Sequence, residues 1–425
     1  MLPSSVGVGG MIAFGSGMSA AATATLAARE AATQALETLQ GQTPKLAIVF
    51  ASVSYPDVEL AARTVRSVVG DAQIIGGTSG ACVFDSDTTA PRGVSVVLVA
   101  GDGFEVESRT AQLGSPTFVE TVPVAEKVAQ AADRAALRGF AHFACLVFAP
   151  GVSVDGEALV AAVRKGAGAH AQLAGALTGD DLTMDRPKVF FGDELRDDCV
   201  VVTGIFTKTP IGIAARHGWA AVGPVRTVTR AEGIHLIELD NRPALDVWIE
   251  DAVRAGATPP TDRRELALYL ANHYELGIAS GSSPRVALNP SDAITANGPA
   301  GANELVARAP FAIREDGAIR LSASLSDGLA VRVLHASRKD LLRASSEAAA
   351  SAVLRAGSRV AGALVLACSG RLAALGDCFP QEPAEIRRQI DAPIGGACVF
   401  GEIARNVRDV DAFFNTTAVV IAFAA

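Results

Sequence analysis

Short apolar runs alternate along the chain with amphipathic segments of helical period. Residues 46–51 and 93–100 are almost continuously apolar, which is typical of strands that are buried on both faces. Between them, residues 57–69 place their valines and alanines on one helical face. Residues 73–76 predict a further strand, which ends in a glycine turn at 76–80. The pattern predicts a unit of a strand, a helix, a second strand with a glycine turn, and a third strand.

The same order of elements recurs in two later segments. We predict a second unit (strand 144–149, helix 156–165, turn 174–181, strand 199–206) and a third unit (strand 363–367, helix 383–390, turn 395–401, strand 416–423). The pentapeptide Gly-Ala-Cys-Val-Phe occurs at residues 80–84 and again at 396–400, equally far behind the first strand of its unit. We therefore expect the two copies to occupy equivalent positions of the first and third units.

The chain outside these units is less periodic. The N-terminal part predicts a strand at 11–14, a turn at 15–17 and a helix that begins near Ser19. Between residues 207 and 342 we predict further elements (strands 235–239 and 266–270, helix 242–255, loop 281–301, hairpin 318–325 with 329–335). A helix at 337–356 then leads into the third unit.

Together these elements predict an α/β protein. We expect pseudo-symmetric repeats of strand-helix-strand-strand units, whose mixed sheets are flanked by helices, in two related halves. A domain boundary is placed near residue 232, after a connection marked by glycine and proline. The N-terminal half, residues 1–232, would carry two units, and the C-terminal half, residues 233–425, would carry the third. Related units meet at related interfaces, where a ligand can bind.

Composition narrows the classes of function. Of the 425 residues, 49% are hydrophobic and 19% are charged, which is typical of a folded globular chain. The net charge of −8 argues against nucleic acid as a partner, because binding to phosphates needs clustered Lys and Arg. No run approaches the ~20 apolar residues of a membrane-spanning helix, so we expect no membrane insertion. The six cysteines include no Cys-x-x-Cys pair and lie mostly in apolar runs, which favours reduced thiols and a cytoplasmic location.

Several short motifs occur in an order that resembles the FIST proteins, named after F-box and intracellular signal transduction proteins. These motifs are His217-Gly218-Trp219 and Ala231-Glu232-Gly233, similar to the junction of the family's two halves, and then Cys368-Ser369-Gly370-Arg371, Gly401-Glu402-Ile403 and Asn415-Thr416-Thr417, similar to its Cys-x-x-Arg, Gly-Glu-Ile and Asn-x-Thr segments. The resemblance extends from Gly15 to Ala425. It departs at Phe414, where many relatives carry a histidine.

The resemblance implies a sensory module of signal transduction that binds a small ligand, such as an amino acid or a related metabolite. We expect a stand-alone cytoplasmic sensor, without catalytic activity or a cofactor, that signals through a partner such as a histidine kinase. Nothing in this chain resembles a transmitter, a receiver or a helix-turn-helix. Some family members are haem-binding nitric oxide sensors. A haem sensor with His217 as axial ligand is therefore an alternative.

The first candidate site lies in the C-terminal half. Cys368 and Arg371 follow one predicted strand, and Gly401 and Glu402 follow the strand that should be its neighbour. Such strand ends form the ligand crevice of many α/β sheets. Arg371 suits a carboxylate and Glu402 suits an ammonium group, so that together they would bind an amino acid. The family's Asn-x-Thr segment adds Asn415.

The second candidate site is the glycine turn of the first unit. Backbone N–H groups at Gly76, Gly77 and Thr78 can face an anion, although the glycines can equally serve only to permit a tight turn. Arg371 and Glu402 likewise can form an internal ion pair instead of a ligand site. An enzyme that uses Cys368 or the Arg371/Glu402 pair is a further alternative, but no histidine base is near Cys368 in the sequence. No two of the six histidines have the spacing of a zinc site.

Overall fold

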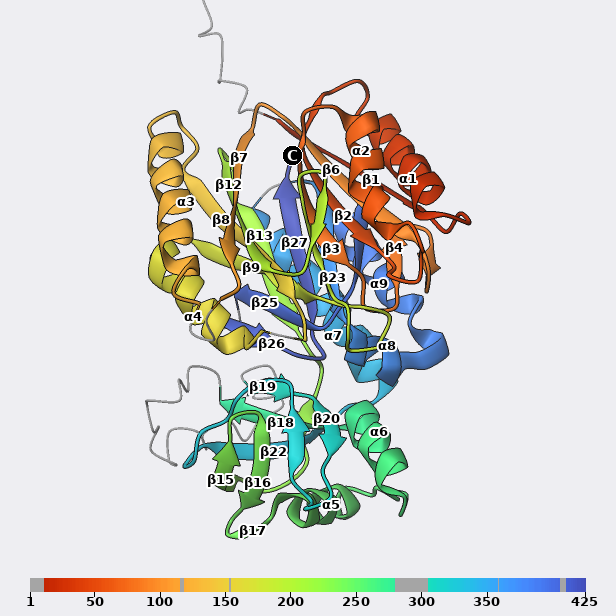
Figure 1. Ribbon diagram of the computed structural model, residues 1–425, viewed down its shortest axis with the longest axis vertical. Coiled ribbons are helices and arrows are strands. Elements are labelled where there is room, and N and C mark those ends of the chain that lie inside the picture. Colours follow the sequence, from red (N-terminus) through yellow and green to blue (C-terminus); the bar gives the residue numbers. More distant parts are fainter. Residues whose placement is uncertain (1–10, 115–117, 153, 280–304, 358, 406–409) are drawn as a thin grey trace, which may run out of the picture.

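A three-unit body and a smaller domain beneath it make up the described part of the chain (Figure 1). The computed structural model describes residues 11–114, 118–152, 154–279, 305–357, 359–405 and 410–425, so the loop predicted at 281–301 lies outside the described residues. The inner faces of the body's sheets meet in a central core that includes Phe50, Phe148 and Leu366. Helices cover the outer faces, where each sheet forms a separate core with its own helices.

The three units of the body share one order of elements. The first consists of β1 (Ile12–Ser19), α1 (Ala24–Thr38), β2 (Pro44–Ala51), the 3-10 turn η1 (Val58–Leu60), α2 (Ala61–Val69), β3 (Gln73–Thr78), β4 (Val83–Asp85), β5 (Thr89–Ala90) and β6 (Val94–Gly101). The second consists of β7 (Phe104–Gln112), α3 (Thr121–Ala136), β8 (His142–Pro150), α4 (Gly156–Ala167), β9 (Gln172–Thr178), β10 (Val189–Phe191), β11 (Glu194–Arg196) and β12 (Cys199–Thr207). The third consists of β13 (Ile211–Arg216), α7 (Arg338–Ala356), β23 (Val360–Cys368), α8 (Ser369–Leu375), the 3-10 turn η3 (Gly376–Cys378), α9 (Gln381–Ile390), β24 (Ile394–Val399), β25 (Gly401–Arg405), β26 (Asp411–Phe414) and β27 (Ala418–Ala424).

The units are interlocked by an exchange of hairpins. The body's sheets have equivalent strand orders, and the last two strands of each come from another unit: β1-β6-β2-β3-β10-β11, β7-β12-β8-β9-β25-β26 and β13-β27-β23-β24-β4-β5. The second unit completes the first sheet, the third unit completes the second sheet, and the first unit completes the third. Because this exchange is closed, no unit forms its whole sheet from its own strands.

The smaller domain is inserted into the third unit, between β13 and α7. It consists of β14 (Ala220–Ala221), β15 (Arg226–Glu232), β16 (His235–Leu239), β17 (Arg242–Pro243), α5 (Ala244–Arg254), α6 (Arg263–His273), β18 (Tyr274–Ala279), β19 (Leu305–Arg308), β20 (Pro310–Ile313), β21 (Ile319–Leu321) and β22 (Ala330–His335). In Figure 1 its strand β19 faces β26 of the body. The third unit therefore draws on both sides of residue 232, because β13 pairs with β27 near the end of the chain.

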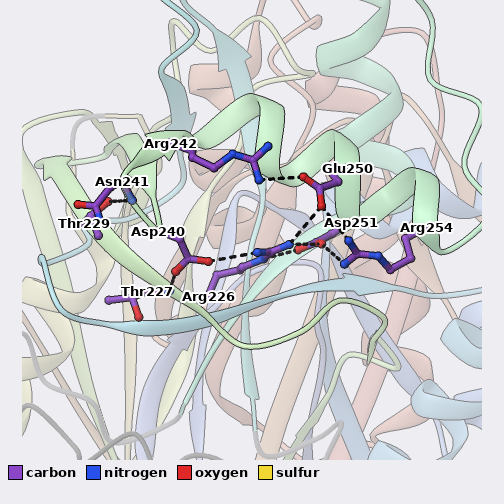
Figure 2. A network of polar contacts seen from close by, with 9 residues as sticks. All are labelled: Arg226, Thr227, Thr229, Asp240, Asn241, Arg242, Glu250, Asp251 and Arg254. Atoms are coloured by element: carbon purple, nitrogen blue, oxygen red, sulfur yellow. Dashed lines mark hydrogen bonds and ion pairs between the residues drawn. The ribbon is translucent and has the colours of Figure 1, made fainter.

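A network of ion pairs joins strand and helix within the smaller domain (Figure 2). Arg226 of β15 donates from Nε and Nη2 to the two carboxylate oxygens of Asp251 on α5, at 2.9 and 2.6 Å. The side chain of Asp251 is fully buried, and Arg254 also donates to it at 3.0 Å. Asp240 accepts from Arg226 at 3.2 Å. The buried carboxylate is thus fully paired, which is the condition under which a buried charge is tolerated.

The structure confirms the α/β class and corrects three local predictions. The predicted turn at 15–17 lies inside β1, where a Cβ atom on Gly15 would stand 2.1 Å from the carbonyl oxygen of Ala35, so the glycine allows α1 to pack closely. The predicted strand 266–270 is part of α6, which buries Leu266 and Leu270 one helical turn apart. The predicted hairpin does not form, since β21 pairs with β16 and β20 whereas β22 pairs with β14, β15 and β18.

The two pentapeptides also do not occupy equivalent positions. The first copy leads into the exchanged strand β4, and the second lies in the central strand β24. The two strands pair antiparallel, with Phe84 opposite Gly396 and Val83 opposite Ala397. Gly76 is the equivalent of Gly396, because it lies opposite Val49 as Gly396 lies opposite Val365. The connection between the two parallel strands is longer in the third unit, where it contains α8 and α9. The pentapeptide therefore begins at a different structural position from its copy in the first unit.

In the described part of the chain, none of the helices combines the length and the apolar composition needed to cross a bilayer.

Candidate functional site

The candidate residues Cys368, Glu402 and Asn415 come together where the third unit meets the smaller domain. Cys368 is the last residue of β23, Glu402 lies in β25, and Asn415 follows β26. All three are buried, with at most 5% of the residue exposed. The carboxyl group of Glu402 lies within hydrogen-bond reach of the Cys368 thiol and accepts from the backbone N–H of Thr417 at 3.4 Å. A Cβ atom on Gly401 would stand 3.3 Å from the amide nitrogen of Asn415.

Arg371 belongs to a buried ion pair that is fully paired within the protein. It is fully buried and pairs with the equally buried Glu382 of α9, with Nη2 and Nε at 2.7 and 2.9 Å from Oε2. Its remaining donors reach four further protein oxygens (the carbonyls of His217, Thr416 and Leu341, and the hydroxyl of Ser345). In the structure Arg371 therefore forms an internal ion pair, with Glu382 and not with Glu402. No donor of this guanidinium remains for a ligand carboxylate.

Sequence reasoning missed Glu275 and Arg308, which the smaller domain brings to the same place. Glu275 of β18 and Arg308 of β19 are fully buried. Thr416 and Arg308 lie close enough to Glu275 to interact with its carboxyl group. Arg308 donates to the carbonyl oxygen of Phe413 at 3.0 Å and pairs with Glu157 at the start of α4, so it joins three parts of the fold. The signal in the sequence was a glutamate inside the run Tyr274-Glu275-Leu276-Gly277-Ile278.

We call Glu275, Arg308, Cys368, Glu402, Asn415 and Thr416 the polar cluster. Within the described residues, several of its buried polar atoms have no hydrogen-bond partner of good geometry: both carboxylate oxygens of Glu275, Oε1 of Glu402, Nδ2 of Asn415, Oγ1 of Thr416 and Nε of Arg308. Each unpaired buried polar atom costs ~1–3 kcal/mol of stability. Such a concentration of unpaired donors and acceptors distinguishes the polar cluster from the Arg371–Glu382 ion pair, whose polar atoms are all paired.

The electrostatics of the polar cluster favour the neutral forms of its two carboxyl groups and its thiol. Burial raises the pKa of Glu275 and that of Glu402 well above the ordinary range of a carboxyl group. Burial likewise raises the pKa of the Cys368 thiol, and the nearby carboxyl groups of Glu402 and Glu275 raise it further. A catalytic cysteine needs the opposite shift, since the thiolate is the nucleophile. Glu402 does supply the base that the sequence lacked, but the thiol beside it is not activated.

A cavity of about 190 Å³ lies between the body and the smaller domain. The ends of β8 and β9 line it with Gly151, Asp155 and Leu177, the residue Phe400 lines it from the third unit, and Arg320 and Ser322 line it from the smaller domain. The Ser322 hydroxyl donates to the side-chain oxygen of Asn415, which connects the cavity to the cluster. The cavity is smaller than the ~300–1,000 Å³ of sites for drug-sized ligands, and it suits a small metabolite.

The glycine turn predicted to begin at Gly76 is wrong, because Gly76, Gly77 and Thr78 are the last residues of β3, where they serve close packing. A Cβ atom on Gly76, whose φ is +125°, would stand 2.1 Å from the carbonyl oxygen of Val49 on the neighbouring strand. On Gly77 it would stand 2.4 Å from the carbonyl oxygen of Lys188. The hydroxyl of Thr78 donates to Gly179 and accepts from the backbone N–H of Lys188, at 2.5 and 2.8 Å. These residues hold the exchanged strand β10 against β3, away from the polar cluster.

His217 does not fit the role of a haem ligand. It is 2% exposed, and its Nδ1 accepts from the backbone N–H of Trp219 at 2.9 Å. Nε2 then carries the proton and donates to the carbonyl oxygen of Leu305 at 2.9 Å. Both ring nitrogens are therefore used within the protein. Across the described ranges there is also no group of three or more His, Cys, Asp or Glu side chains arranged to hold a metal ion.

Comparison with known proteins agrees with the sequence motifs. A search of the curated proteins found no match. The family model of the FIST N domain matches residues 45–242, and that of the FIST C domain matches residues 244–405, so that the two matches cover most of the chain. The chain belongs to the FIST family, whose domains are sensory domains of signal transduction.

Proposed function

We propose that this protein is a cytoplasmic sensor that binds a small metabolite of the amino-acid type between the body and the smaller domain. The observation that carries the proposal is the polar cluster, whose unpaired buried atoms come from both sides of this interface. Glu402 and Asn415 belong to the body, whereas Glu275 belongs to the smaller domain. The cavity gives a small ligand room at the same interface, and its lining residue Ser322 connects it to the cluster by donating to Asn415.

The polar cluster offers complementary chemistry to a molecule that carries an ammonium group and an acceptor. Glu275 and Glu402 present unpaired carboxyl oxygens, which suit N–H donors of a ligand. Asn415 Nδ2 and Arg308 Nε are unpaired donors, which suit a carboxylate or carbonyl oxygen. The expected ammonium-binding role of Glu402 is kept in this proposal, and Arg308 and Asn415 take the place of Arg371 as donors. A cationic ligand would lower the raised pKa of the two glutamates, so that binding releases protons.

The position of the polar cluster also provides a way to report binding. The smaller domain contacts the body through Arg308, which reaches Glu157 and Phe413, and through Ser322, which reaches Asn415. A ligand that bridges Glu275 and Glu402 interacts with both sides at once and therefore favours one arrangement of the two parts. A difference in affinity between two arrangements is what allows a ligand to shift their populations. The partner that reads this arrangement is proposed to be a signalling protein such as a histidine kinase.

Native mass spectrometry of the purified full-length chain tests the proposal. We expect a small molecule to be retained, or to be taken up from a panel of amino acids and amines, with one molecule bound per chain. Glu402→Gln keeps the shape of the side chain and should weaken binding roughly tenfold or more, because a charged hydrogen bond contributes ~1.5–3 kcal/mol. The variant Glu385→Gln is the matched control, since the partly exposed Glu385 pairs with the exposed Arg388 on α9, away from the polar cluster. Equal binding by both variants, or no binding by any member of the panel, contradicts the proposed site.

A further inference from the structure

The duplicated pentapeptide, which the ligand site does not use, brings two thiols together. Cys82 directly precedes β4, and Cys398 lies in β24. The backbone N–H of Cys398 donates to the carbonyl oxygen of Cys82 at 2.9 Å. The antiparallel register, with Val83 opposite Ala397, continues to place Cys82 opposite Cys398. Their side chains lie within hydrogen-bond reach of each other. Two cysteines far apart in sequence are therefore direct cross-strand neighbours.

The two thiols have different surroundings. Cys398 is fully buried, whereas Cys82 is 4% exposed and follows an irregular stretch in which Ala81 has a φ of +74°. Burial raises the pKa of Cys398, and the contact with Cys82 raises it further. The other four cysteines lie elsewhere: Cys145 in β8, Cys199 in β12, Cys368 at the end of β23, and Cys378 at a partly exposed position. Within the pair, Cys82 keeps the residual exposure and is reached by a small oxidant before Cys398, which is placed to react second.

We propose that Cys82 and Cys398 form a dithiol oxidation site that takes peroxides and closes to a disulfide between the first and third units. The sulfur of Cys82 attacks the peroxide, the O–O bond breaks, and Cys82 becomes a sulfenic acid while one water leaves. The sulfur of Cys398 then displaces the hydroxyl group from Cys82, and its own proton leaves with that hydroxyl as a second water. Two thiols lose two electrons and two protons in total, and one hydrogen peroxide is reduced to two waters.

The position of this pair gives the oxidation a structural consequence. β4 is the strand that the first unit contributes to the sheet of the third unit, so a disulfide at this point covalently fixes the exchange. A cross-link between residues so distant in the chain restricts the unfolded state strongly. The oxidised protein should therefore unfold at a higher temperature than the reduced protein. Cys398 also lies within electrostatic reach of Cys368, which places the cross-link near the polar cluster.

Peptide mapping of the full-length protein tests the inference. The reduced chain is treated with hydrogen peroxide, the remaining thiols are alkylated, and the digest is analysed by mass spectrometry without reductant. We expect a linked peptide pair that contains Cys82 and Cys398, with two hydrogens fewer than the separate peptides, which dithiothreitol separates. The midpoint of thermal unfolding should rise by several degrees on oxidation and return on reduction.

Variants separate this pair from nonspecific oxidation. Cys82→Ala should remove both the linked peptide and the rise in the midpoint, whereas Cys378→Ala should keep both. The mapping of the wild type does not depend on how well a variant folds. The inference is overturned if Cys82 and Cys398 are recovered alkylated, or as separately oxidised sulfinic acids, after other thiols have reacted.

Discussion

Two groups of buried charges lie close together in the third unit, and they differ in how completely they are paired. Arg371 and Glu382 satisfy each other, and the other donors of Arg371 reach backbone and hydroxyl oxygens. Glu402, by contrast, keeps an unpaired oxygen, as does Glu275 across the domain interface. Burial alone therefore does not distinguish the structural charges from those of the proposed ligand site. Pairing does, because a fully paired buried charge has no remaining capacity to bind a ligand.

The largest predicted effect concerns the paired group. Arg371→Met leaves Glu382 buried without a partner, and removal of one member of a buried ion pair costs ~3–5 kcal/mol. We expect a loss of this size in the free energy of unfolding, measured by urea denaturation in the absence of any ligand. The double variant Arg371→Met/Glu382→Gln should recover part of the loss, because the uncompensated carboxylate is gone.

Arg343→Met is the matched control for that experiment. Arg343 lies on α7 with a side chain that is 62% exposed, and it pairs with Asp340 and Glu347. Exposed ion pairs of this kind contribute ~0–1 kcal/mol. If Arg371→Met were as mild as Arg343→Met, the assignment of Arg371 to the structural group would be wrong.

A smaller loss is predicted for the paired network of the smaller domain. Arg226→Met removes the bidentate partner of Asp251, but Arg254 remains bonded to the same carboxylate. We therefore expect a loss of ~1–3 kcal/mol, below that of Arg371→Met. Arg242→Met, at a half-exposed pair with Glu250, should change the stability by less than ~1 kcal/mol. Equal effects of the two variants in chemical denaturation would remove the distinction between the buried and exposed parts of Figure 2.

The last predicted effect has the opposite sign and belongs to the unpaired group. Glu275→Gln should stabilise the ligand-free protein at pH 7–8, because the wild type must there either ionise a buried carboxyl group or hold a proton that the unfolded chain releases. The pKa of Glu275 is raised in the folded state, so its contribution to stability is complete below the unfolded pKa and is lost as the pH rises through the folded pKa. We expect a gain in the free energy of unfolding at pH 7–8, because burial raises the pKa of Glu275 and the glutamine carries no such titration.

The gain should vanish as the pH falls toward the ordinary pKa of glutamate, about 4.3. Unfolding curves of wild type and Glu275→Gln between pH 4 and pH 8 check this. A gain that is the same at every pH would show that packing, and not titration, causes it. A loss at neutral pH would mean that the carboxylate is paired after all.

Much of the fold could be predicted from local patterns, because each unit repeats apolar strand runs and amphipathic helices that the sequence shows directly. The strands at Val360–Cys368 and Ala418–Ala424 follow from such runs. The exchange of hairpins could not be predicted in this way, since the short strands β4, β10 and β25 carry no signal of which sheet they join. The identical pentapeptides even suggested equivalence, although they are partners in one sheet.

The candidate site was predicted in part. Motif resemblance and strand ends led to Cys368, Glu402 and Asn415, which do meet. Arg371 pairs with Glu382 on α9, and the local sequence pattern does not show how α9 is oriented relative to α8. Glu402 was therefore expected as the ion-pair partner instead of Glu382. Glu275 lies in the weakly periodic region, and only the docking of the smaller domain places it beside Thr416. Long-range contacts of this kind leave no trace in local spacing.

The central claim is that the unpaired group binds the ligand and the paired groups hold the fold. Thermal unfolding of the wild type, Glu402→Gln and Arg226→Met, with and without the best ligand from a panel of amino acids and amines, tests it most directly. A ligand at a hundred times its dissociation constant adds ~2.7 kcal/mol to the stability of the wild type. The account predicts that Glu402→Gln loses no stability but loses most of the ligand-induced shift, whereas Arg226→Met loses stability and keeps the shift. A full shift in Glu402→Gln would contradict it.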